Sequence, residues 1–413
     1  MIKYKAIAIL LLFLYLISLA FSNITTIIEY FLLHGSIPYN NIIQEEKVNI
    51  TVYIKSILMI LWNIFWMTYL FKKAYKILLI NIFLLISGIL VANFSITSIY
   101  FIVADIRILN GIDAAIGVFF ITNYFFLKKN DFPISKLAWS VIIISLFDAF
   151  VTIIEFIIIN GSFGFRAMGI FANSQINAFI LLMSISLLHV IYSKNQIRFL
   201  IYVLFYIIFS VAILMTGTRA IALALLLTTY ILVINYLVNL YKSDVNIKRM
   251  IITGSFLTIF ILAPIGIDRI NSLANRGDIL NQSEGGRVTK FYNIIDSLID
   301  DSVTNFLIGK GSGYGSNVVT SMSENVNSAY KTVDGTINYV FVRNGLLGLC
   351  FLPILFFIIF KVINTIDINR IILLLNTITI SLSVNLFEIY IIMLMIGITV
   401  SYLNYYYPVR RTT

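Results

Sequence analysis

Three arginines in this sequence stand near small residues, two of them at short breaks between apolar segments and one within a long polar segment. Arg166 follows the turn GSFGF at 161–165, Arg219 lies in MTGTRA at 215–220, and Arg287 follows two glycines at 285–286. A guanidinium group is planar and forked, so it can hold two phosphate oxygens at once, which an ammonium group cannot. Three such groups could hold a diphosphate from three sides. Pairing of each arginine with an acid, Asp148, Glu155 or Glu388, is the alternative.

Other polar residues could complete a site for a phosphorylated sugar. The Asp334 carboxylate could accept a proton from a sugar hydroxyl, although it could also pair with Lys331 or cap the next helix. Three tyrosines are further candidates: Tyr292, Tyr314 and Tyr330. Each could offer a ring on which a sugar stacks, or could belong to a hydrophobic core. We therefore assign Arg219, Arg287 and Asp334 to catalysis. We assign diphosphate or glycan binding to Arg166, Asn173, Arg276 and Tyr314.

Metal and thiol chemistry have little support in the sequence. The single cysteine, Cys350, lies in the apolar run 346–360, and His34 and His189 show no metal-ligand spacing. The glycine-rich stretch 309–316 resembles a nucleotide-binding loop only superficially, because no buried strand precedes it. A tight turn beside a ligand and a plain flexible turn both remain open for this stretch. We expect no metal and no cofactor.

The elements that must position these residues are membrane helices. The chain has 413 residues, of which 60% are hydrophobic and 12% charged, with a mean hydropathy of +0.96, whereas soluble proteins carry about 25% charged residues. Apolar runs long enough to cross a bilayer predict an all-α polytopic fold. Twelve spans are expected, at 6–22, 54–71, 77–102, 108–127, 137–159, 170–191, 199–216, 220–241, 250–266, 336–360, 371–387 and 389–407.

The distribution of basic residues predicts the orientation of these spans. Of the 29 Lys and Arg residues, 17 lie in the links that share a side with the N-terminus, whereas the short links of the opposite side carry five. Cytoplasmic links carry the excess of basic residues, so both termini are expected in the cytoplasm. This clustering between spans also argues against nucleic-acid binding as the reason for the net charge of +10.

One long polar segment interrupts the membrane pattern and defines three regions: 1–266 with nine spans, the outer loop 267–335, and 336–413 with three spans and a cytoplasmic tail. Within the loop, apolar residues recur at three- and four-residue steps, which predicts an amphipathic helix: Val288, Phe291, Ile295, Leu298 and Ile299. We expect a folded cap on the membrane body. A flexible linker is the alternative.

An ordered set of motifs resembles the O-antigen polymerase (Wzy) and O-antigen ligase superfamily. The motifs are R-x-x-G-x-x-x-N at 166–173, GTRA at 217–220, GR at 286–287, G-x-G-x-G at 309–313 and NGLLG at 344–348. The ligases carry a histidine eleven residues before the first glycine of the last motif, and Asp334 stands there in this chain. The resemblance therefore favours a polymerase over a ligase.

The resemblance implies a metal-independent glycosyltransferase with a GT-C-like fold in the bacterial inner membrane. Its partners would be an undecaprenyl-diphosphate-linked oligosaccharide, membrane lipids and a chain-length regulator. A polymerase transfers the growing glycan from its lipid diphosphate to the non-reducing end of a new repeat unit at the periplasmic face, whereas a ligase transfers the finished glycan to lipid A core. A flippase or transporter for lipid-linked sugars is a further alternative.

Overall fold

The computed structural model describes eight ranges, 134–158, 166–171, 174–241, 287–310, 328–330, 335–360, 368–381 and 390–406, and a few isolated positions, including Tyr314. Every element in these ranges is helical and none is a strand. The expected all-helical fold class is thus confirmed for this part of the chain. The expected spans 6–22, 54–71, 77–102, 108–127 and 250–266 lie outside it, apart from isolated helical positions in the first two.

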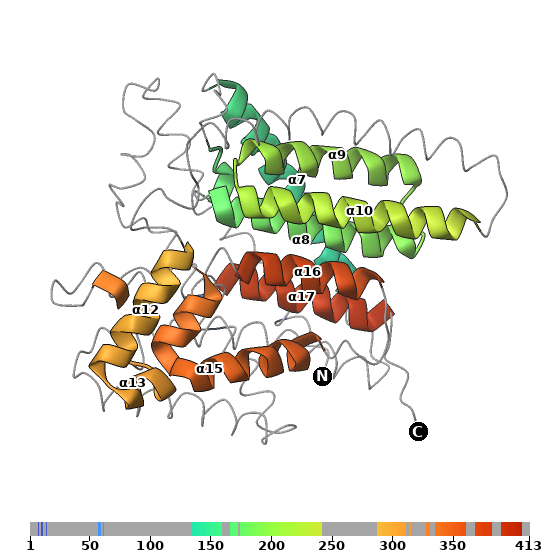
Figure 1. Ribbon diagram of the computed structural model, residues 1–413. Coiled ribbons are helices and arrows are strands. Elements are labelled where there is room, and N and C mark those ends of the chain that lie inside the picture. Colours follow the sequence, from blue (N-terminus) through green and yellow to red (C-terminus); the bar gives the residue numbers. More distant parts are fainter. Residues whose placement is uncertain are drawn as a thin grey trace, which may run out of the picture.

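Six long helices among the described residues form a bundle, in which α8, α9, α10, α16 and α17 run side by side (Figure 1). Their starts and ends follow the expected spans within a few residues, except that the described part of α16 ends early. Two segments are long and apolar enough to cross a membrane, Ser135–Ile157 and Ser174–Ser193. The bundle helices are α7 (Ile134–Ile158), α8 (Ser174–Ser193), α9 (Phe199–Met215), α10 (Arg219–Tyr241), α16 (Ile368–Ser381) and α17 (Tyr390–Tyr406).

Helix α7 has the side-chain arrangement of a lipid-facing helix. It buries its polar residues Ser145, Asp148, Thr152 and Glu155. Its large apolar side chains recur at three- and four-residue steps along the opposite face and are exposed; they are Ile143 (62% exposed), Phe147, Phe150, Ile154 and Ile157. A water-soluble helix does the reverse. The pattern is typical of a helix that packs polar groups inward and contacts hydrocarbon outward.

Helix α8 lies at the centre of the bundle and is buried on almost all sides by α7, α9, α10, α16 and α17. Small polar side chains join it to its neighbours. The Ser184 hydroxyl donates to Ser145 Oγ on α7 at 2.7 Å, and the Asn376 amide on α16 donates to Ser186 Oγ at 3.0 Å. Such side chains hold helices together where lipid provides no hydrophobic driving force.

The expected span 336–360 is not one straight helix. Helix α15 (Thr336–Phe360) bends sharply at Gly345, which has the non-helical angles φ 59° and ψ −155° (Figure 1). A side chain at Gly345 would collide with the backbone of Leu307 and Gly309. The bend therefore exists because a distant turn packs directly against the helix backbone at this point.

The first half of α15 joins two hydrophobic cores. Tyr339 and Val340 belong to the core of the bundle, whereas the next two residues, Phe341 and Val342, belong to a second core. This second core is built with α12 (Arg287–Asp301), α13 (Val303–Ile308) and the short turn η2 (Ser328–Tyr330). We call this unit the cap. Its core thus continues past residue 335 into α15.

The amphipathic helix expected in the long loop is present as α12. Ile294 and Leu298 are buried in the cap core, with Phe291 and Ile295 partly buried beside them. Ile299, which the sequence pattern counted on the same face, is exposed. The buried stripe is centred on positions 294 and 298, so Ile299 falls at its edge.

Candidate functional site

The structure describes the side chain of some predicted site residues and only the backbone of others. The Arg166 side chain is exposed. Arg219 and Arg287 are the first residues of α10 and α12, and only their backbone positions are described. The predicted residues that lie outside the described part of the chain are Asn173, Arg276 and Asp334.

The segment that carries Arg166 is held by two buried carboxylates of α7. Glu155 Oε2 accepts hydrogen bonds from the backbone N–H groups of Met168 at 3.0 Å and Gly169 at 2.8 Å. Asp148 Oδ1 accepts from the N–H of Ile170 at 3.0 Å. Asp148 and Glu155, which we call the carboxylate pair, therefore anchor the backbone two to four residues after Arg166. No ion pair joins Arg166 to any residue that the structure describes.

Gly169 packs closely against side chains of α7 and α8. Its φ of +57° is strained for any residue with a side chain. A Cβ atom there would also collide with the side chains of Asp148, Thr152 and Asn177. Asn177 Nδ2 donates to Thr152 Oγ1 at 2.8 Å, and this hydrogen bond joins α8 to α7 beside Gly169. The glycine is thus required both by its backbone angles and by the space available.

The same segment is joined to the turn between α9 and α10. The Ala167 N–H donates to the Met215 carbonyl at 3.2 Å, and the Thr218 hydroxyl donates to the Ser174 carbonyl at 3.2 Å. Gly217, with a φ of +63°, directly follows Thr216, the C-cap residue of α9. Two of the predicted arginine segments, around Arg166 and Arg219, therefore meet at one end of the bundle although they are far apart in the sequence.

The third arginine segment belongs to the cap. Arg287 is the first residue of α12, and the end of α12 away from α13 is directed toward the end of the bundle where α8 and α10 begin (Figure 1). The partial positive charge at a helix N-terminus adds to that of an arginine there.

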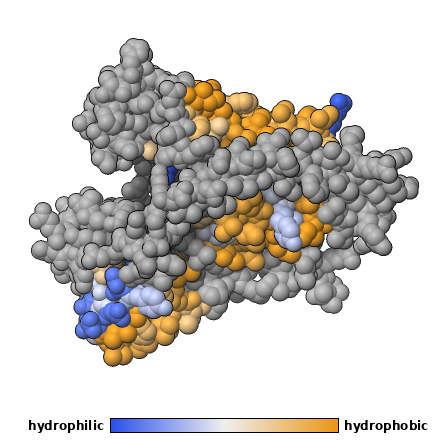
Figure 2. All heavy atoms as spheres, turned by 45° about the horizontal axis from the view of Figure 1, so that its top comes forward, coloured by the Kyte–Doolittle hydropathy of each residue, from blue (hydrophilic) through white to orange (hydrophobic). Residues whose placement is uncertain are grey.

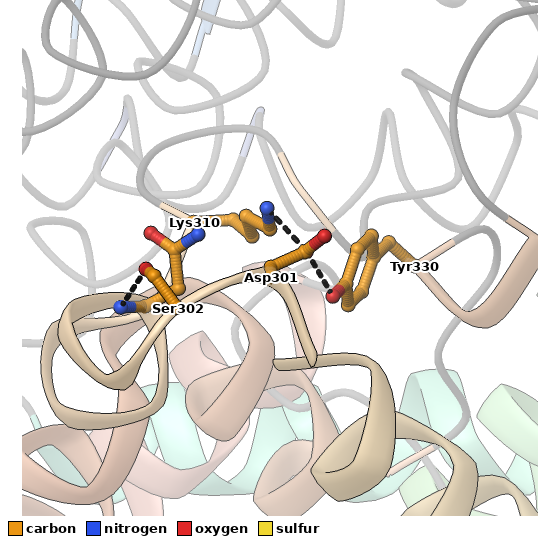
Figure 3. Close-up of polar contacts among 5 residues, drawn as sticks. Asp301, Ser302, Lys310 and Tyr330 are labelled. Carbon is orange, nitrogen blue, oxygen red and sulfur yellow. Dashed lines mark hydrogen bonds and ion pairs between the residues drawn. The ribbon is translucent and has the colours of Figure 1, made fainter. Parts of the chain in front are cut away.

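The cap contains a polar cluster of its own, shown in Figure 3. Asp301 Oδ2 accepts from the Tyr330 hydroxyl at 2.6 Å and forms an ion pair with Lys310 Nζ at 2.5 Å. The hydrogen bond from Lys310, and then that from Tyr330, hold the pKa of Asp301 below its usual value. Burial, followed by the bond to Asp301, raises the pKa of the Tyr330 hydroxyl. The cluster ties the end of α12 to the glycine-containing turn and to η2.

Tyr314, predicted as a sugar-binding ring, lies in the cap core. It is 8% exposed and packs edge-on against Tyr330, with ring centroids 6.1 Å apart. Burial raises the pKa of its hydroxyl. Tyr292 on α12 is 60% exposed.

The first two residues of the stretch 309–316 pack against the backbone of α15. Gly309, with a φ of +79°, lies against the backbone of Arg343 and Asn344. The Lys310 N–H donates to the Val342 carbonyl at 2.8 Å. The turn thus packs onto α15 beside the bend at Gly345, so these two glycine motifs of the sequence meet in space.

The anchoring role of the carboxylate pair was not predicted. A signal was available, because Asp148 and Glu155 stand seven residues apart in an apolar helix and therefore share one face. Ionisable residues within membrane segments are functional candidates by default.

Within the described residues, no group of three or more His, Cys, Asp or Glu side chains is arranged to hold a metal ion.

The described part of the chain is all-helical, and two of its helices are long and apolar enough to cross a membrane. In comparisons with known proteins, no family model, no curated protein and no solved structure matches the chain. The functional argument therefore depends on the residues and their arrangement.

Proposed function

We propose that this chain is an O-antigen-type polysaccharide polymerase of the bacterial inner membrane. It is a metal-independent GT-C-type glycosyltransferase with about twelve spans, both termini in the cytoplasm and its active face in the periplasm. It moves the growing glycan from undecaprenyl diphosphate to the non-reducing end of a lipid-linked repeat unit. Membrane lipids and a chain-length regulator are its further expected partners.

One observation carries this proposal: the segments of Arg166 and Arg219 meet at one end of an apolar bundle. There the Ala167 N–H donates to the Met215 carbonyl, and the Thr218 hydroxyl donates to the Ser174 carbonyl at the start of α8. The exposed Arg166 guanidinium has no ion-pair partner among the described residues, so its charge is available to a ligand. A lipid-linked diphosphate presents its charge at the membrane surface. Its phosphate oxygens suit forked guanidinium donors.

The proposed chemistry needs no metal because the sugar already carries a good leaving group. The acceptor hydroxyl oxygen attacks the anomeric carbon, the bond from that carbon to the diphosphate oxygen breaks, and Asp334 takes the hydroxyl proton. Arg219 and Arg287 stabilise the negative charge that develops on the leaving undecaprenyl diphosphate. Arg166, Arg276 and Asn173 bind the diphosphate and the glycan before transfer.

The test is a chain-length assay with purified protein and a lipid-linked repeat unit. Replacing Arg166, Arg219 or Arg287 by alanine should abolish or sharply shorten the polymer. Arg198→Ala is the matched control, because Arg198 is also exposed but precedes α9 at the opposite end, about 25 Å from Met215 by helix length. Full-length polymer from the Arg166 and Arg219 variants would overturn the proposal.

The fate of the glycan in cells distinguishes the alternatives. Loss of a polymerase leaves single repeat units on the surface, whereas loss of a flippase traps them inside the cell. Loss of a ligase leaves finished polymer on its lipid carrier. Only the first outcome agrees with the proposed function.

A further inference from the structure

The cap carries an apolar surface that its own core does not use. Helix α13 turns Phe306 inward, where its ring packs edge-on against Phe341 with centroids 5.8 Å apart. Its other large apolar side chains point away from this core, and Val303 is 72% exposed. Together with the residues just after the bend of α15, they form what we call the α13 surface: Val303, Leu307, Ile308, Leu346 and Leu347.

This surface is continuous because two glycines bring its two parts together. Gly345 lies against the backbone of Leu307, and Gly309 lies against the backbone of Arg343 and Asn344. The exposed side chains of Leu307 and Ile308 are therefore neighbours of Leu346 and Leu347. Ser302 starts α13 by accepting a hydrogen bond from the Asn305 N–H at 3.1 Å, so the helix is a defined element of the cap.

The chemistry of the surface indicates what covers it. Neither α13 nor the second half of α15, residues 346–360, contains a charged residue. That half of α15 is about 22 Å long and has the composition of a membrane segment. Charged side chains of the cap lie beside this surface, on α12, where Asp296 and Asp300 are exposed, and at Lys310, whose ammonium group pairs with Asp301. In Figure 2, hydrophobic surface gathers along the lower edge of the molecule beside a hydrophilic region at the lower left.

We propose that the α13 surface lies in the outer leaflet of the membrane and anchors the cap to lipid. The argument is continuity: Leu346 and Leu347 begin an uncharged helix of membrane composition, and α13 is packed against that beginning. Amphipathic elements at an interface bury their apolar face at the boundary of headgroups and acyl chains. The side chains of Val303, Leu307 and Ile308 contact acyl chains while the acidic face of α12 stays in water. This inference depends on membrane insertion but is independent of the proposed polymerase activity.

Single spin labels test the proposal in the full-length protein. Cys350 is the only cysteine and is exposed on the second half of α15, so a label there is the reference for lipid contact. In a Cys350→Ser background, Val303→Cys and Leu347→Cys label the surface. Asp300→Cys is the matched control, three residues from Val303 on the acidic face of α12. The protein is reconstituted in phosphatidylglycerol–phosphatidylethanolamine vesicles, and collisions with oxygen and with a water-soluble nickel chelate are measured.

The label at position 303 should give a ratio of oxygen to nickel collisions several-fold higher than the label at 300, and close to that at 350. Equal ratios at 303 and 300 would show that the surface faces water and would overturn the proposal. Low collision rates with both reagents at 303 would show a protein partner or a second copy, and would overturn it too. The result at Leu347 keeps the test decisive if the label at 303 disturbs α13.

Discussion

Replacing Glu155 by alanine removes the acceptor of two backbone hydrogen bonds, one buried and one partly buried. Met168 and Gly169 would keep N–H groups that point into the space left by the carboxylate. A buried donor without an acceptor costs about 1–3 kcal/mol, so the Gly169 N–H alone makes local opening of the segment 166–171 easier by about 2 kcal/mol, and the partly buried Met168 N–H adds to this. Glu155→Gln is the matched control, because its amide oxygen still accepts both bonds and no charge has to be buried.

Hydrogen exchange measured by mass spectrometry reads this effect directly, since exchange follows the free energy of local opening. Lowering the free energy of local opening by about 2 kcal/mol speeds exchange about 30-fold. The peptide covering 166–171 should therefore exchange at least this much faster in Glu155→Ala. A peptide from the centre of α8, residues 181–188, should be unchanged. Unchanged exchange in 166–171 would refute the reasoning. An equal rise in both peptides would show that Glu155 supports the whole bundle and does not anchor one segment.

Two further predictions concern the cap. Alanine at Gly309 or Gly345 should lower the melting temperature of the detergent-solubilised protein, because each position has a positive φ that costs about 1–2 kcal/mol and a Cβ there meets backbone. Leu346→Ala, at an exposed side chain, should melt like the wild type, and equal melting of all three variants would contradict the role of the bend. The cap should also loosen at both ends of the pH scale, as followed by near-ultraviolet circular dichroism. The lowered pKa of Asp301 gives stability that is present above its usual value of 3.8 and lost as the pH falls further. The raised pKa of Tyr330 gives stability that is present below 10.0 and lost as the pH rises beyond it. Asp301→Asn should remove the acid transition, and an unaltered transition in that variant would show that another group titrates.

The sequence determined the helical class and most helix positions, for a simple physical reason. A long apolar run must satisfy its backbone hydrogen bonds internally in lipid, so composition and length together indicate a helix. The helix of the long loop followed from a three- and four-residue apolar repeat, and α12 has this helix at 287–301. These are local properties that each segment carries by itself.

Tertiary structure decided what no single segment could specify. The bend in α15 arises where the turn at Gly309 packs against Gly345. The sequence of 336–360 by itself predicts one straight span, because it does not show this contact. Asp148 and Glu155 anchor a backbone segment more than ten residues away, although their charge suggested ion pairs with arginines. Tyr314 is buried against Tyr330 because the cap needs a core of its own. In each case the controlling contact joins residues distant in sequence, and only the folded chain brings them within reach.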